Sequence, residues 1–79
     1  MQNVIILPIA IGDTVFRVVS WANEVRQGKV SMLQQKADGT WKFRISEGSF
    51  VYDLPITDIG INVFLSYAEA QAQLNKMEI

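Results

Sequence analysis

The side chains that could perform chemistry in this chain are carboxylates and serines, because the sequence contains no cysteine and no histidine. Without those two residue types, a thiol nucleophile, an imidazole base, a disulfide framework and the common zinc sites are excluded. The serines have no histidine that would activate a hydroxyl, and no phosphate-binding loop of the G-x-x-x-x-G-K type occurs. We therefore expect no enzymatic activity and no catalytic residue.

Most of the eight acidic residues have a structural explanation in the sequence. Asp13 and Asp38 lie in expected turns, and Glu69 fits the cap of an expected helix. Asp53 and Asp58 lack such a role and could ligate a cation together, but two carboxylates alone make a weak site. We expect solvated charges at these positions, with no bound metal and no cofactor.

Basic residues are concentrated in the first part of the chain. Residues 14–46 have a net charge of +4 and residues 47–79 a net charge of −4, whereas the whole chain has −1. A basic half with an exposed aromatic ring could bind nucleic acid by contacting phosphates and stacking on a base. The residues of this alternative are Arg17, Trp21, Arg26, Lys29, Lys42 and Arg44. We favour mutual neutralisation of the two halves, because dedicated nucleic-acid modules usually carry a net positive charge.

A run of aliphatic side chains near the start of the chain suggests a protein interface. Residues 4–11 read V-I-I-L-P-I-A-I, which is shorter than the ~20 apolar residues that span a bilayer. The run also lacks the basic flank and cleavage site of a signal peptide, so we expect a cytoplasmic protein without a membrane contact.

Exposed apolar patches usually mark interaction sites, and an edge strand offers free backbone groups to a partner. We expect a protein partner here, with a homodimer as one form of the interaction. The predicted interface residues are Val4, Ile5, Ile6, Leu7 and Ile9. The competing interpretation is that this segment pairs within its own sheet and plugs one end of it.

The elements that must position these residues are short strands and one helix. The chain has 79 residues, of which 49% are hydrophobic, and we expect a single domain. Residues that favour strands predict them at 14–20, 25–35, 40–46, 50–54 and 63–65. Gly28 is the expected bulge or bend, Val30 and Met32 are expected on one face, and Asp38-Gly39 predicts a type I′ hairpin.

Two local patterns are clear. Between residues 40 and 46, Trp41, Phe43 and Ile45 alternate with Lys42 and Arg44, which predicts one buried and one exposed face. The expected core residues outside this strand are Phe16, Val18, Phe50 and Phe64.

The second pattern is a capping box at Ser66 and Glu69, which predicts a helix over residues 66–77. The helix face expected against the sheet consists of Tyr67, Ala70, Leu74 and Met77.

Five strands and a helix in so short a chain favour a small closed barrel, because closure removes exposed sheet edges. We predict a mainly β fold, an SH3-like small barrel of about five strands with a C-terminal α-helix. The extended segment covers residues 1–11, the barrel 12–65 and the helix 66–77.

Three motifs carry a resemblance to known proteins: I-G-D-x-V at residues 11–15, Asp38-Gly39 before an alternating aromatic strand, and V-F-L-S-x-x-E-A at residues 63–70. The chain resembles a group of small, uncharacterised SH3-like barrel proteins of Gram-positive bacteria and their phages, over residues 11–74. These motifs concern architecture and contain no chemistry. The resemblance implies a phage or prophage accessory protein, and we expect a non-catalytic interaction module that binds or inhibits a host protein such as a defence component.

Overall fold

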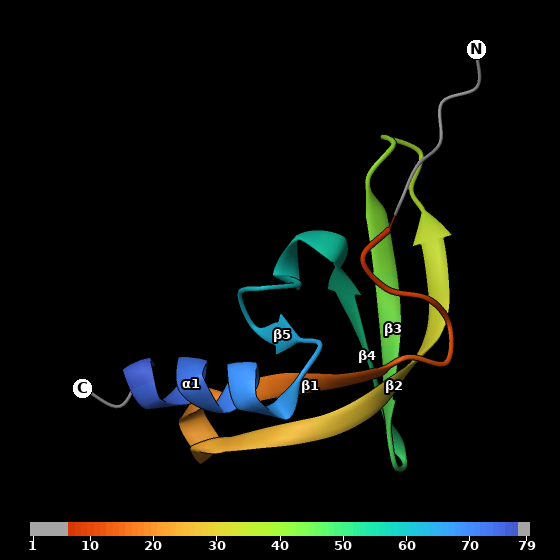
Figure 1. Ribbon diagram of the computed structural model, residues 1–79. Helices are drawn as coiled ribbons and strands as arrows, with labels where there is room; N and C mark the ends of the chain where they lie inside the picture. The colour runs from red at the N-terminus through yellow and green to blue at the C-terminus, as the bar shows by residue number, and fades with distance from the viewer. Residues whose placement is uncertain (1–6, 78–79) are drawn as a thin grey trace.

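The computed structural model of the chain describes residues 7–77, which form one sheet and one α-helix (Figure 1). The strands are β1 (Thr14–Val19), β2 (Glu24–Gln35), β3 (Trp41–Glu47), β4 (Phe50–Pro55) and β5 (Val63–Phe64). The α-helix is α1 (Tyr67–Met77), and two short 3-10 helices are η1 (Ser20–Ala22) and η2 (Ile56–Asp58). The five strands are antiparallel in the order β4-β3-β2-β1-β5, which confirms the mainly β prediction with a C-terminal helix.

The sheet bends sharply along β2, its longest strand. The first part of β2 pairs with β1 and the last part pairs with β3. In Figure 1, β1 and β2 therefore run across the lower part of the molecule while β3 and β4 stand upright. The sheet is not closed, because β4 and β5 lie at opposite ends of the strand order and pair with different neighbours. The expected barrel is thus an open, strongly bent sheet in this structure.

A bulge in β2 corrects the prediction that Val30 and Met32 share a face, and it does not lie at Gly28, which was expected as a bulge or a bend. The register with β3 shifts between Val30 and Met32, so Ser31 has no cross-strand partner and the bulge lies three residues beyond Gly28. Val30 is opposite Ile45, whereas Met32 is opposite Arg44. Because the bulge inserts one residue into the two-residue period of the strand, Val30 and Met32 point to opposite faces and not to one.

The first core lies on the face of the sheet that carries Phe43 and Ile45, which we call the inner face. Both side chains are fully buried while Lys42 and Arg44 are not, so the predicted alternation of β3 is confirmed. Trp41, expected to be buried, is only half-buried at the start of the strand. The buried residues of this core are Ile9, Val15, Val30, Phe43, Ile45 and Val63.

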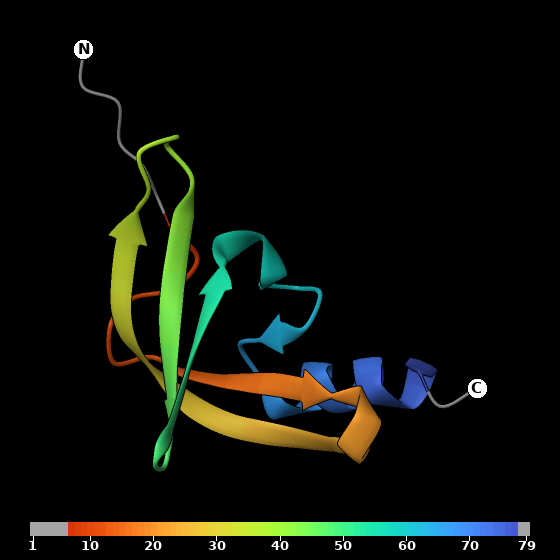
Figure 2. The same cartoon turned by 180° about the vertical axis from the view of Figure 1, so that it is seen from behind.

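The second core lies on the opposite, outer face, where α1 covers β1 and β5. Figure 2 shows β1 in front and α1 behind it, so the helix and the β3–β4 hairpin are not on the same side of β1. Phe16 and Val18 point toward the helix because they alternate with Val15 along the strand. The residues of this core are Val18, Phe64, Ala70 and Leu74, with Phe16 and Val25 partly buried against them.

The start of α1 follows the predicted cap in part. The Glu69 amide donates a hydrogen bond of 3.2 Å to the Ser66 hydroxyl, as expected of an N-cap. Within residues 7–77 the Glu69 carboxylate returns no hydrogen bond to Ser66, so the capping box is only half formed. Tyr67 and Met77, expected against the sheet, are 56% and 45% exposed because they lie at the rim of the helix face.

The loop between β2 and β3 differs from the predicted type I′ turn. The Gly39 amide donates to the Lys36 carbonyl at 2.9 Å and the Lys36 amide to the Thr40 carbonyl at 2.7 Å, which leaves a three-residue loop. Only Gly39 has a positive φ, of +90°, whereas a type I′ turn needs a positive φ at both central residues. The Asp38 carboxylate instead accepts hydrogen bonds from the amide and the hydroxyl of Thr40. These bonds lower the pKa of Asp38, and the bond from the hydroxyl is the largest cause.

Candidate functional site

Two arginines lie side by side on the inner face of the sheet. Arg17 of β1 is directly opposite Arg26 of β2, and Val19 is directly opposite Glu24. Residues opposite one another in an antiparallel pair point to the same face, so the two guanidinium groups are neighbours. Like charges in such positions repel one another, and each arginine therefore needs a carboxylate.

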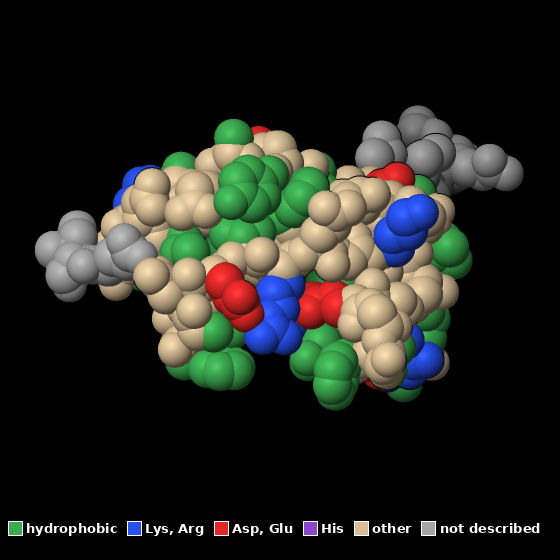
Figure 3. All heavy atoms as spheres, turned by 90° about the horizontal axis from the view of Figure 1, so that it is seen from below, with side chains coloured by type: hydrophobic (Ala, Val, Ile, Leu, Met, Phe, Trp, Pro, Cys, Tyr) green, Lys and Arg blue, Asp and Glu red, His purple; other side chains and the backbone are tan. Residues whose placement is uncertain are grey.

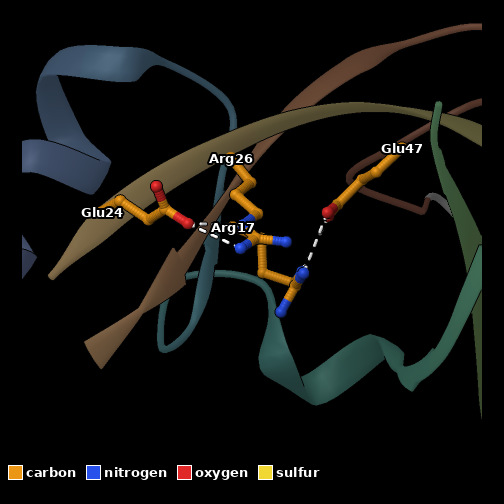
Figure 4. A network of polar contacts seen from close by, with 4 residues as sticks. All are labelled: Arg17, Glu24, Arg26 and Glu47. Carbon is orange, nitrogen blue, oxygen red and sulfur yellow. Dashed lines mark hydrogen bonds and ion pairs between the residues drawn. The ribbon is translucent and has the colours of Figure 1, made fainter. Parts of the chain in front are cut away.

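Each arginine has its own carboxylate. Arg17 donates from Nε and Nη2 to the two oxygens of Glu47, over 2.7 and 2.9 Å. Arg26 donates from Nε to one oxygen of Glu24 over 2.8 Å, and its Nη2 atom lies 2.6 Å from the same oxygen in an ion pair. We call Glu24, Arg26, Arg17 and Glu47 the arginine row, in which the two arginines lie between the two carboxylates, as Figure 4 shows.

The Arg17–Glu47 pair is the buried part of the row. The two side chains are 17% and 8% exposed, and the Arg17 guanidinium also lies 4.1 Å from the centre of the Tyr52 ring. The hydrogen bond to Glu47 is the main cause that raises the pKa of Arg17. Arg17 is on β1 whereas Glu47 and Tyr52 are on β3 and β4, so this contact ties together two parts of the bent sheet that share no backbone pairing.

Two exposed aromatic residues lie near the ends of the row along the chain: Phe50 is opposite Glu47, and Trp21 precedes Glu24 by three positions. Trp21 is 86% exposed and belongs to η1, which joins β1 and β2. Trp21 does not continue β1, because the chain leaves the strand at Ser20 and reverses through Asn23, which has a positive φ of 53°. Figure 3 shows acidic, basic and acidic side chains in a line on one face, with hydrophobic side chains on both sides of it.

Phe50 corrects a prediction about the core. Phe50 was expected in the core. It is opposite Glu47 on the inner face, but its side chain is 64% exposed. The reason is its place at the end of the β3–β4 hairpin, next to the two-residue loop, where the first core has already ended. Sequence reasoning missed Phe50 as a surface residue, because a phenylalanine in a strand is usually buried.

The remaining candidate cations lie on the outer face. Arg44 donates to both oxygens of Asp53, over 2.7 and 3.2 Å, and the Lys42 ammonium is 3.9 Å from the same carboxylate. The Arg44 hydrogen bond is the main cause that lowers the pKa of Asp53 and raises that of Arg44. Asp53 is therefore an ion-pair partner, and Asp58 lies apart from it in η2. Among residues 7–77, no three acidic side chains gather in the manner of a metal site.

The structure thus divides the cations of the predicted nucleic-acid site between two faces. Arg17 and Arg26 come together on the inner face, and Lys29, Lys42 and Arg44 are on the outer face, whereas Trp21 lies outside the sheet in η1. Four of these five cations bind carboxylates, and within residues 7–77 Lys29 is the one without an ion pair. Arg17, Lys42 and Arg44 pair with carboxylates of residues 47–79, whereas Arg26 pairs with Glu24 of its own half.

The predicted interface near the start of the chain falls largely outside the described residues. Val4, Ile5 and Ile6 are among the undescribed ones, and Leu7 is half-buried. Ile9 is 4% exposed and belongs to the first core, so its side chain is already covered by its own chain and is not a free contact for a partner. The segment after it is held to β2 by a hydrogen bond of 2.8 Å from the Gly12 amide to the Val30 carbonyl.

Three further observations complete the description of the site. Residues 7–77 form no pocket, and α1, the one α-helix among them, is too short and too polar to cross a bilayer. Comparison with protein families, with curated proteins and with solved structures finds no match to this chain. The surface formed by Trp21 and the arginine row is therefore the candidate functional site on geometric grounds alone.

Proposed function

We propose that this chain is a non-catalytic protein-binding module whose binding face is formed by Trp21 and the arginine row. The observation that carries the proposal is the 86% exposure of Trp21 in η1, which joins β1 and β2, the strands that hold Arg17 and Arg26. Tryptophan and arginine are the residues most enriched among those that dominate the binding energy of protein interfaces. Exposing an indole ring to water is unfavourable, and a partner that covers the ring removes its apolar surface from contact with water.

The composition of this face favours a protein over a nucleic acid. Its two arginines are matched by Glu24 and Glu47, so the row has no net charge. Phosphate binding depends on uncompensated cations that release condensed counterions, and carboxylates within the row would repel a phosphate backbone. A protein partner with polar groups of both signs around an apolar pocket for Trp21 fits this surface better.

The finer fold that we propose is the SH3-like class. Its support is the order β4-β3-β2-β1-β5 with antiparallel neighbours, a long bent β2 and a 3-10 helix between β4 and β5. The resemblance to phage proteins adds the proposal that the partner is a host or phage protein, such as a defence component. That part rests on the motifs and on no contact of the structure.

Affinity capture from a bacterial lysate, with identification by mass spectrometry, tests the proposal. The baits are the full chain, a Trp21→Ser variant, and a matched Ile61→Ser control, in which a 57% exposed residue away from the row is changed. We expect a protein that the parent and the control retain and that Trp21→Ser loses. A parallel titration of labelled single-stranded DNA and RNA at increasing salt tests the alternative. Salt-sensitive binding that Trp21→Ser abolishes, without any protein that depends on Trp21, would overturn the proposal in favour of nucleic acid.

A further inference from the structure

The sheet has an open edge at β4. This strand is at one end of the strand order and pairs only with β3. Glu47 and Phe50 flank the two-residue loop and close the hairpin, so their backbone groups bond one another, and the pattern then alternates along the strand. It follows that Phe50, Tyr52 and Leu54 bond to β3, whereas the amides and carbonyls of Val51 and Asp53 point away from it. Within residues 7–77 these outward groups have no hydrogen-bond partner.

The usual protections of a sheet edge are weak here. Natural edge strands are guarded by unpaired charges, prolines, bulges or a covering segment. Asp53 is the one charged residue of β4, and Arg44 and Lys42 already neutralise it. Pro55 stands at the end of the strand and leaves the edge before it open. Phe50 and Val51 are 64% and 59% exposed along the same stretch.

We propose that β4 pairs with β4 of a second copy of this chain, antiparallel and about a two-fold axis at Tyr52. In this register Val51 is opposite Asp53 of the second copy, and each such pair exchanges two backbone hydrogen bonds through the outward groups. Phe50 comes opposite Leu54 of the second copy, and the two Tyr52 rings are cross-strand neighbours. Apolar and aromatic cross-strand pairs of this kind stabilise a sheet.

The other two-fold registers are less favourable. Centring the pair on Asp53 would oppose two carboxylates and bring Pro55, which has no amide hydrogen, opposite Val51. Centring it on Val51 would bring Asp53 opposite Ser49 in the loop and leave Leu54 without a strand partner. The Tyr52 register is the one that pairs both outward residues and keeps like charges apart. A two-fold contact also closes on itself, so it ends at a dimer.

This dimer goes beyond the proposed function, because it uses the edge of β4 and involves neither Trp21 nor the interface predicted near residue 7. Sedimentation equilibrium of the full chain tests it. The parent should show twice the chain mass of 8.9 kDa, and Val51→Pro should show a single chain mass with an unchanged far-UV spectrum. Proline removes the outward amide of Val51 and no bond to β3, so the fold is retained. Val51→Thr keeps that amide and should remain a dimer.

Disulfide trapping tests the register independently, since the chain contains no cysteine. Tyr52→Cys should oxidise to a covalent dimer, because residues at a two-fold axis face one another within the reach of a disulfide. Asp53→Cys faces Val51 of the second copy and should cross-link far less. A parent that stays monomeric at high concentration, or a Val51→Pro variant that stays dimeric, overturns the proposal. Loss of the dimer in Leu7→Lys with retention in Val51→Pro would assign the contact to the start of the chain instead.

Discussion

The glycine at position 28 provides the sharpest test of how β2 and β3 pack. Gly28 is buried on the inner face of β2, at the point where the strand passes from β1 to β3. A Cβ atom at this position would overlap the Ile45 side chain and would lie 2.9 Å from Cγ of Glu47 and 3.0 Å from the Ser46 carbonyl oxygen. We expect Gly28→Ala to destabilise the protein.

The size of the effect follows from how little these neighbours can move. Ile45 is fully buried in the first core, the Ser46 oxygen belongs to the backbone, and Glu47 is held by Arg17. Overpacking of this kind costs about 1–3 kcal/mol, and we expect the upper end of that range because β3 must shift away from β2. A chain of this length has a free energy of unfolding of about 4–12 kcal/mol, so the loss is a large part of it.

Urea denaturation of three variants measures the effect. Gln27→Ala is the matched control, since the neighbouring side chain is exposed and its loss should change the midpoint little. Ile45→Ala removes the atom that the new Cβ overlaps, so the double variant Gly28→Ala with Ile45→Ala should be at least about 1 kcal/mol more stable than the sum of the two losses predicts. A Gly28→Ala protein with the parent's midpoint, or strictly additive losses, would refute the proposed packing.

Three further outcomes can be measured by denaturation. Phe43→Ala should reduce the free energy of unfolding by about 3–5 kcal/mol, because the ring is fully buried in the first core. Ser66→Ala should reduce it by about 1 kcal/mol through loss of the Glu69 cap, whereas Ser66→Asp should not. Arg44 holds the pKa of Asp53 below its usual 3.8, so this stabilisation is present above that pH and is lost as the pH falls through the lowered folded-state value. The free energy of unfolding of Asp53→Asn should therefore fall less steeply with decreasing pH than that of the parent. Equal slopes of this free energy against pH in the two proteins would contradict the ion pair.

Local patterns in the sequence predicted the elements well. The helix was expected over residues 66–77 and α1 spans Tyr67–Met77, and the alternation from Trp41 gives the buried Phe43 and Ile45. These features depend on neighbouring residues, which the sequence displays directly. The bulge at Ser31 and the three-residue loop before Thr40 depend on how two strands align, and Gly28 and Asp38-Gly39 each permit more than one alignment.

The candidate site could not be predicted in the same way. Arg17 and Glu47 are 30 positions apart and meet because β2 bends and brings β3 back across β1. The exposure of Trp21 depends on the turn at Asn23, and that of Phe50 on where the first core ends. The basic residues were visible in the sequence, but the face on which each lies depends on strand registers that composition does not contain.

The uneven distribution of charge along the chain has an explanation in these registers. Three of the four ion pairs among residues 7–77 join a cation of the basic half to a carboxylate of the acidic half: Arg17–Glu47, Arg44–Asp53 and Lys42–Asp53. Such pairs form only when β1, β3 and β4 reach their native positions relative to one another. The segregation that first suggested a phosphate-binding surface thus corresponds, in these three pairs, to ion pairs that join strands within the fold. Among the exposed apolar side chains of residues 7–77, Trp21 carries the proposed protein contact, and Phe50 and Val51 flank the proposed pairing of β4.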